Sequence, residues 1–323
     1  MKKNILGLAV FAIIVVGITY AIAFPSLGDA TFSSQMNIVE HGNSKGISNP
    51  NLSYVLRSSL PSVPEQVMVY QAEKPSVSKE SFEALGAKVG LTGPINESSN
   101  EFVLTSGNSI LEIHEKSGRI ALIDNSRWNI INGKDIPSKL PTDDVAIRLA
   151  SDFLIKSNLM PKDAVLSKIY HPQVLALDSS GKTTDIPYEA IQVSFKRSID
   201  EIPVVGAGSK LRVEIGEGGD VIQMYKLWRD YTPQEKRSII TPDKAFLNFK
   251  ERGISGISTT DSAVAEINNV YLAYYESSAM EEQNLFLPVY VFEGNVENSD
   301  NSDAFTEYIP AIPGLEPTIP IAK

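Results

Sequence analysis

The chain contains no cysteine among its 323 residues. It can therefore form no disulfide bond, no thiolate zinc site and no cysteine nucleophile, and it has no cysteine near the N-terminus to carry a lipid. Histidine is scarce, with three in the chain: His41, His114 and His171. They are too scattered for a metal site built from neighbouring residues, and no H-E-x-x-H motif is present. The sequence predicts no metal ion and no other cofactor.

Positive charge is also in short supply. The 29 lysines and arginines are outnumbered by 39 aspartates and glutamates, which gives a formal net charge of −10. Nucleic-acid binding is therefore disfavoured, because that function needs a basic surface. With 42% hydrophobic and 21% charged residues, the composition is that of a globular protein, and the chain is long enough for one or two domains with their own cores.

Motifs of common catalytic sites are missing as well. No G-x-S-x-G motif marks a serine nucleophile. The glycine-rich residues 206–209 lead into an expected strand, whereas a phosphate-binding loop is followed by a helix. Asp143 and Asp144 are adjacent at an expected helix start, where the helix dipole explains them. The acidic run 293–303 lacks the spacing of a calcium-binding loop. The sequence predicts that the protein is not an enzyme, and an unrecognised enzyme is the least favoured alternative.

The N-terminus carries the one long apolar run. Residues 1–24 begin with Lys2 and Lys3 and continue without a charge from Ile5 to Phe24. About 20 apolar residues span a bilayer, which favours a transmembrane anchor with the rest of the chain outside the cytoplasm. The alternative is a cleaved signal and secretion, because residues 21–23 resemble an A-x-A cleavage site.

The stretch 188–231 contains the clearest strands. Ile191, Val193 and Phe195 alternate with polar residues, and so do Leu211 and Val213. A period of two is typical of strands with one buried face. Residues 216–219 (GEGG) supply the positive φ of a tight hairpin before a return strand at 221–228. The stretch predicts a curved antiparallel sheet, and a further short strand is expected before it, at 164–170.

Helix starts and an internal repeat complete the predicted fold. Capped helices are expected at Ser78, Thr142 and Thr241. A group of residues recurs 100 positions later: Leu111, Ile113, Gly118 and Trp128 correspond to Leu211, Val213, Gly218 and Trp228. The predicted fold class is α+β, with two or three repeated units of a helix packed on a curved antiparallel sheet, preceded by the transmembrane segment. The predicted domains are an anchor or signal at 1–24, a polar linker at 25–64, a first α+β unit at 65–135, further α+β units at 136–294, and an acidic, proline-rich tail at 295–323.

The segment Gln192–Asp230 resembles the N-terminal propeptide module of thermolysin- and fungalysin-like metallopeptidases and the related PepSY domain. The shared features are the strand before residues 202–206 (IPVVG), the alternating strand 211–215, the glycine turn and the return strand. The strands expected near 271–275 and 285–292 resemble the last hairpin of such units, so the resemblance covers about residues 142–294. It implies a module that folds or inhibits a peptidase, or an independent extracytoplasmic binding domain. This sequence departs from the family because no peptidase domain follows.

Aromatic residues are the candidates for a partner-binding face. They gather after the central sheet and in the last hairpin, at Tyr225, Trp228, Tyr231, Tyr274 and Tyr275. An exposed aromatic patch marks a protein-binding face, although core packing is the commoner role of such residues. The sequence therefore predicts a membrane-anchored, extracytoplasmic, non-catalytic binding or regulatory protein that binds a protein or peptide partner, such as a peptidase or another envelope protein. The alternative is a structural or accessory subunit of a membrane complex.

Overall fold

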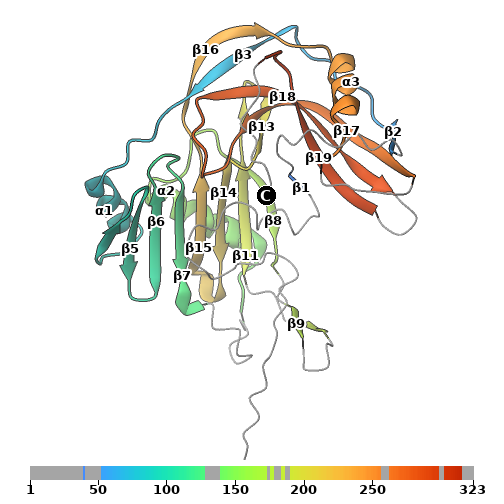
Figure 1. Cartoon of the computed structure of the whole chain (residues 1–323). Coiled ribbons are helices and arrows are strands. Elements are labelled where there is room, and N and C mark those ends of the chain that lie inside the picture. Colours follow the sequence, from blue (N-terminus) through green and yellow to red (C-terminus); the bar gives the residue numbers. More distant parts are fainter. Residues whose placement is uncertain are drawn as a thin grey trace, which may run out of the picture.

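The structure is a computed structural model that describes residues 39–40, 52–127, 139–172, 175–177, 183–185, 190–255, 262–297 and 302–314. Two large β-sheets dominate the described part of the chain (Figure 1). The long antiparallel ribbon of β3 (Gln66–Ala72) and β16 (Tyr231–Ser238) arches over one end of the molecule and connects the two sheets. A separate small sheet pairs β9 (Leu175–Leu177) with β10 (Thr183–Asp185).

The first large sheet has eight strands, and every neighbouring pair is antiparallel. Its strands are, in order across the sheet, β4 (Ile95–Glu97), β5 (Glu101–Ser106), β6 (Ser109–His114), β7 (Ile120–Asp124), β15 (Val221–Leu227), β14 (Lys210–Ile215), β11 (Ile191–Lys196) and β8 (Val165–Tyr170). The chain reaches the middle of the sheet twice, and β7 pairs there with β15. The two edge strands are therefore β4 and β8.

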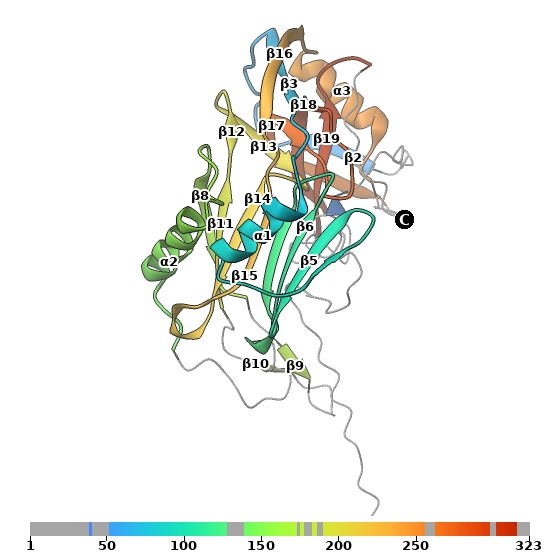
Figure 2. The same cartoon turned by 90° about the vertical axis from the view of Figure 1, so that its left-hand side faces the viewer.

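Two helices cover one face of this sheet: α1 (Lys79–Lys88) and α2 (Asp143–Lys156) (Figure 2). Phe82 of α1 and Leu154 of α2 are buried in a single hydrophobic core with strand residues such as Leu111 and Leu211. Period-two alternation sends strand residues such as Val193 and Leu211 to the helix side, and sends their chain neighbours Gln192 and Arg212 to the opposite face. Both helices thus belong to one shared core.

The second large sheet has nine strands and is built around two long hairpins. Its main path runs through β1 (Val39–Glu40), β19 (Ser302–Pro310), β18 (Leu285–Glu297), β17 (Ala263–Glu276), β13 (Ile202–Gly206) and β12 (Ser198–Ile199). β2 (Leu52–Leu56) also pairs with β17, in parallel, and β3 pairs with the start of β18. The ninth strand is β16, which joins the sheet through β3. Because β12 and β13 lie between β11 and β14 in the sequence, the chain leaves the first sheet, joins the second and returns.

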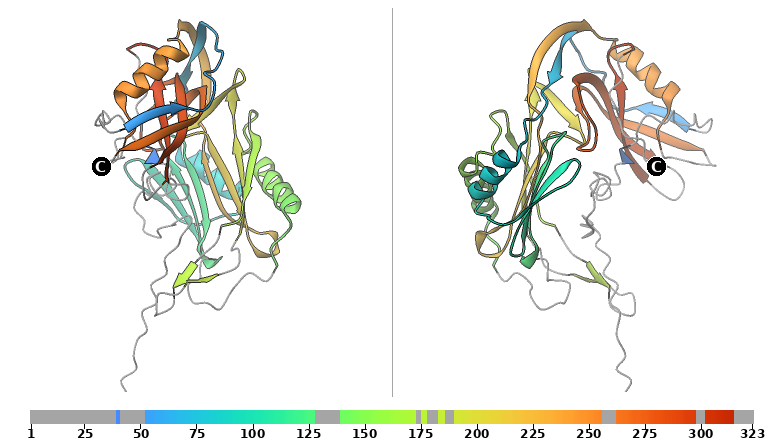
Figure 3. Two further views of the ribbon diagram at one scale, coloured as in Figure 1. Left: turned by 90° about the vertical axis from the view of Figure 1, so that its right-hand side faces the viewer. Right: turned by 60° about the vertical axis from the view of Figure 1, so that its left-hand side comes forward.

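Helix α3 (Pro242–Arg252) packs on the second sheet, away from α1 and α2 (Figure 3). Phe249 is fully buried, and its ring stacks on that of Phe292 from β18 with centroids 4.6 Å apart. Tyr54 of β2 meets the same ring edge-on at 5.4 Å. Stacked and edge-on rings contribute more than their buried area alone, so Phe249 fixes α3 against strands from both ends of the chain.

The predicted fold class is wrong. The described residues are mainly β, with two large sheets and three α-helices, and they do not form repeated helix-on-sheet units. The local alternation predicts separate small sheets, each covered by its own helix. In the structure the strands at 101–124 and 191–227 merge into one sheet, because the central pair β7 and β15 joins segments about a hundred residues apart. Long hairpins then build the second sheet.

The predicted membrane anchor and membrane localisation are also corrected. None of the described helices is long and apolar enough to cross a membrane: α1, α2 and α3 have 10, 14 and 11 residues. Residues 1–24, to which the prediction assigned the anchor, lie outside the described residues, as does Trp128 of the predicted repeat.

Two predicted domain boundaries do not coincide with the ends of the sheets. Residues 52–56 of the predicted polar linker form β2, which pairs with residues 263–267 of β17. Residues 302–310 of the predicted tail form β19, which pairs with β18 along its whole length. Both segments contribute side chains to the core beneath α3.

Candidate functional site

The aromatic residues predicted to bind a partner do not form one exposed patch. Trp228, Tyr274 and Tyr275 are buried. The Trp228 indole donates a hydrogen bond to Asp163 at 3.0 Å, and the Tyr274 hydroxyl donates to the carbonyl oxygen of Met68 at 2.6 Å. These three rings belong to the protein interior.

Tyr225 and Tyr231 are partly exposed but lie in different surroundings. The Tyr231 ring meets the rings of Tyr70 and Phe286 edge-on, with centroids 5.2 and 5.8 Å away. The Arg212 guanidinium lies 4.8 Å from the centroid of the Tyr225 ring, on the face of the eight-stranded sheet opposite the helices. A partner-binding role for these two tyrosines stays a prediction.

A buried charge cluster lies where the two large sheets meet. Glu276, the last residue of β17, is fully buried and accepts a hydrogen bond from Arg197 at 2.7 Å. It also accepts hydrogen bonds from the Ser209 hydroxyl and from the backbone and side-chain nitrogens of Arg229, the latter two at 3.2 Å. Arg197, Ser209 and Arg229 flank strands of the eight-stranded sheet. One carboxylate therefore ties the two sheets together.

Aromatic rings and backbone carbonyls complete this cluster. The Arg197 guanidinium lies 5.0 Å from the centroids of the Trp228 and Phe286 rings. Arg229 donates to the carbonyl oxygens of Ser277, Ser278 and Glu281 at 2.7–3.0 Å. Buried charges are tolerated when they are paired and hydrogen-bonded. These contacts occupy both guanidinium groups, so the cluster is suited to holding the sheets together.

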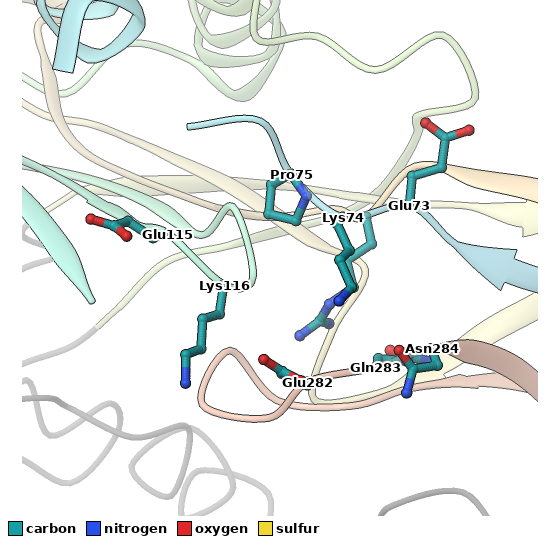
Figure 4. Close-up of a pocket in the computed structure, with 9 residues that line it drawn as sticks. Glu73, Lys74, Pro75, Glu115, Lys116, Glu282, Gln283 and Asn284 are labelled. Carbon is teal, nitrogen blue, oxygen red and sulfur yellow. The ribbon is translucent and has the colours of Figure 1, made fainter. Parts of the chain in front are cut away.

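A pocket of about 160 Å³ opens beside the cluster (Figure 4). It is lined by segments from both sheets: Glu73, Lys74, Pro75, Glu115, Lys116, Arg229, Glu282, Gln283 and Asn284. Pockets for drug-sized ligands are typically ~300–1,000 Å³ and mostly apolar, whereas this one is smaller and lined by charges of both signs. Its buried cation, Arg229, already donates to Glu276. The pocket is therefore the outer rim of the sheet junction.

Other buried titratable groups also serve local contacts. The His114 ring accepts from or donates to the Ser117 hydroxyl at 2.9 Å, and burial, followed by the nearby Arg119 cation, lowers the pKa of His114. Glu307 accepts from the backbone N–H of Ser255 at 2.7 Å, and burial raises the pKa of its carboxyl group to about 7. In the described part of the chain, no three residues of the types His, Asp and Glu are grouped to hold a metal ion.

The β8 edge, residues 165–170, is one end of the eight-stranded sheet. Among the residues that the structure describes, β8 pairs with β11 on one side and with no strand on the other. Val165 and Leu166 at its start are 51% and 46% exposed. Ile155 of α2, the helix that covers this end of the sheet, is also exposed. Exposed apolar side chains on a sheet edge that pairs with no strand favour addition of another strand.

The outer edge of β16 provides a contrast within the same molecule. This strand is exposed over 232–238, and among the described residues it pairs with β3 alone. It carries Pro233 and the charged residues Glu235, Lys236 and Arg237. Proline and charge protect edge strands from unwanted pairing. The first three residues of β8, 165–167, have neither, and Lys168 is the one charged residue of that strand.

Sequence reasoning found the strand of the β8 edge but not its exposure. A short strand is expected at 164–170, and the structure has β8 there. Whether a strand lies at an edge depends on the order of strands across the sheet, which its local sequence does not encode. The sequence contains a weaker indication of the charge cluster. Its charged residues, Arg197, Arg229 and Glu276, each lie at the end of an apolar strand.

Comparisons with known proteins add little. No protein-family model matches the chain, and no curated protein matches it. A solved structure of an uncharacterized protein from Eubacterium rectale ATCC 33656 is similar over 84% of this chain and 92% of its own, with 12% sequence identity and a TM-score of 0.47. This likeness supports no statement about function, and the PepSY-like resemblance stays a prediction.

Proposed function

We propose that the protein is a non-catalytic binding protein that takes an extended segment of a partner protein as an added strand along β8. The observation that supports this proposal best is the β8 edge, which pairs with no described strand on its outer side and bears the exposed side chains of Val165 and Leu166. Added strands gain affinity from main-chain hydrogen bonds and specificity from alternating side chains. An edge of six residues offers room for both.

The register of β8 shapes how a partner strand would pair. Lys168 lies opposite Ser194 of β11, and Leu166 lies opposite Phe195, so Ser167 is an extra residue at a β-bulge. A bulge bends the edge and divides it. The partner segment therefore pairs with residues 165–166 or with residues 168–170. It can pair with both only if the partner strand has its own bulge opposite Ser167.

The experiment uses the full chain and three fluorescein-labelled octapeptides. In each peptide valine or isoleucine alternates with one second residue: glutamate, threonine or lysine. We expect binding, measured by fluorescence anisotropy, and slower hydrogen exchange in β8 without slower exchange in β16. Peptides methylated on alternate backbone nitrogens cannot complete the ladder and are the matched controls. The proposal is overturned if none of the three peptides binds, or if bound peptide leaves exchange in β8 unchanged.

A further inference from the structure

The charged side chains of β8 and of the strand beside it are all cationic. Lys168 is the single charged residue of β8, and Lys196 is the single charged residue of β11. Both are exposed. Lys156 at the end of α2 and Lys162 before β8 are exposed as well. In a chain with a net charge of −10, the β8 edge is therefore locally basic.

Two acidic residues lie near the ends of this edge, and each has a partner. Asp143 of α2 contacts His171, with 2.8 Å between its Oδ1 and the ring Nε2, just after the last residue of β8. Asp163 accepts the indole hydrogen bond of Trp228 at 3.0 Å, and its second carboxylate oxygen lies 3.8 Å from the Arg197 guanidinium. It is oriented toward the sheet junction by two partners from there. The negative charge of Asp163 therefore offsets the arginines of the cluster more than it offsets the lysines of the β8 edge.

The register places the lysines and the exposed leucine on opposite faces of the sheet. Lys168 lies opposite Ser194, whose side chain is on the face away from the helices. Lys196 lies on the same face and opposite Val165. Leu166 lies opposite Phe195, which is part of the core beneath the helices. A strand added to β8 would thus meet lysine on one face and leucine on the other.

We infer that the β8 edge selects an acidic extended segment, in which Asp or Glu alternates with apolar residues. The carboxylates face Lys168 on the neighbouring strand, with Lys196 of β11 on the same face one strand further in. The apolar side chains continue the helix-covered face beside Leu166. This inference rests on the proposed strand addition at β8 and names the chemistry of its partner. Opposite charges across neighbouring strands stabilise pairing, and like charges directly opposite weaken it.

The three peptides described above test the inference. At low ionic strength we expect the glutamate peptide to bind roughly tenfold more tightly than the lysine peptide, with threonine between them. The gap should shrink at high salt, because exposed charges are screened. The double variant Lys168→Glu/Lys196→Glu should reverse the order. Both positions are exposed, so the variant should keep the fold, which circular dichroism would verify.

The matched control is Lys236→Glu on the exposed edge of β16, which should leave the order of the peptides unchanged. Equal binding of all three peptides at β8 would overturn the charge preference while strand addition stands. The inference would also be overturned if the double variant Lys168→Glu/Lys196→Glu still preferred the glutamate peptide. In that case Lys168 and Lys196 would not be the source of the preference. Failure of all three peptides would instead overturn the proposed function.

Discussion

At the scale of single residues, burial decides what the charged groups do. The buried Glu276 carboxylate accepts hydrogen bonds from two arginine side chains. Glu307 on β19 is 2% exposed and accepts a hydrogen bond from the backbone N–H of Ser255. Burial penalises the charged carboxylate, so it raises the pKa of Glu307 to about 7, and the Arg252 cation opposes this only in part. The folded protein therefore binds a proton at Glu307 more tightly than the unfolded chain does.

The pH dependence of stability follows from this raised pKa. Below about pH 4.5 Glu307 is protonated in both states and adds no penalty. As pH rises to about 7, the unfolded chain loses its proton first, and stability falls. Above that range the penalty is on the order of 3 kcal/mol. We expect Glu307→Gln to flatten this fall, as measured by urea unfolding at pH 4.5 to 8. The exposed Glu83→Gln on α1 is the control, and equal slopes in wild type and Glu307→Gln would contradict the expectation.

At the scale of the elements, helix ends were readable from the sequence. Ser78 accepts a hydrogen bond from the backbone of Ser81 at 3.2 Å, and Thr241 accepts from Lys244 at 3.3 Å with Pro242 as the first helical residue. Both predicted caps are confirmed. Thr142 precedes α2 as predicted but makes no side-chain capping bond. Caps involve residues three apart in the sequence, so local pattern is sufficient to find them.

The hairpin glycines were equally readable, and the long-range pairing was not. Gly218 has a φ of 73°, as the predicted turn requires. By contrast, β2 pairs with β17 across more than two hundred residues, and the Ser53 hydroxyl donates to the carbonyl oxygen of Ala263. An alternating pattern indicates that a strand has one buried face, but it does not indicate which strand lies beside it. For the same reason β8 was predicted as a strand and its exposed edge was not.

Helix α3 offers a test of how an element is held in place. Phe249 stacks on Phe292 and contacts Tyr54 edge-on, whereas Leu247 on the same helix is 47% exposed. We expect Phe249→Ala to lower the free energy of unfolding by about 3–5 kcal/mol, because a buried phenylalanine leaves a cavity when truncated. Leu247→Ala should change it by less than about 1 kcal/mol. Urea unfolding of both variants compares them, and similar losses would show that the stack does not hold α3.

At the scale of the whole molecule, three connections join the two sheets among the residues that the structure describes. The chain crosses between them around β12 and β13, the β3 and β16 ribbon arches over both, and the cluster at Glu276 joins them in the interior. The ribbon and the crossing are backbone connections. The cluster differs from both because it depends on one side chain, that of Glu276. A substitution at Glu276 therefore removes this connection and leaves the backbone hydrogen bonds within both sheets in place.

Glu276→Ala should therefore weaken both stability and cooperativity. Removing the carboxylate takes the anion from Arg229 and leaves Arg197 with the more distant Asp163, at 3.8 Å. Breaking a buried ion pair in this way typically costs about 3–5 kcal/mol. In the wild type we expect the slowest-exchanging amides of both sheets to report one common opening free energy, because the sheets unfold together. In the variant the values for β17 and β18 should separate from those for β6 and β14. Native-state hydrogen exchange measures all four strands at once.

The matched control lies on the same strand. Glu266 of β17 pairs with Arg57 at the surface, where ion pairs contribute little, so Glu266→Ala should leave both stability and the common opening unchanged. If Glu276→Ala lowers stability but the two sheets still open together, the ribbon and the crossing couple them without the cluster. Adding Arg229→Met to Glu276→Ala should then recover part of the loss, because it removes the buried cation that has lost its anion. No recovery would mean that the carboxylate acts through its contacts with Ser209 and the backbone instead.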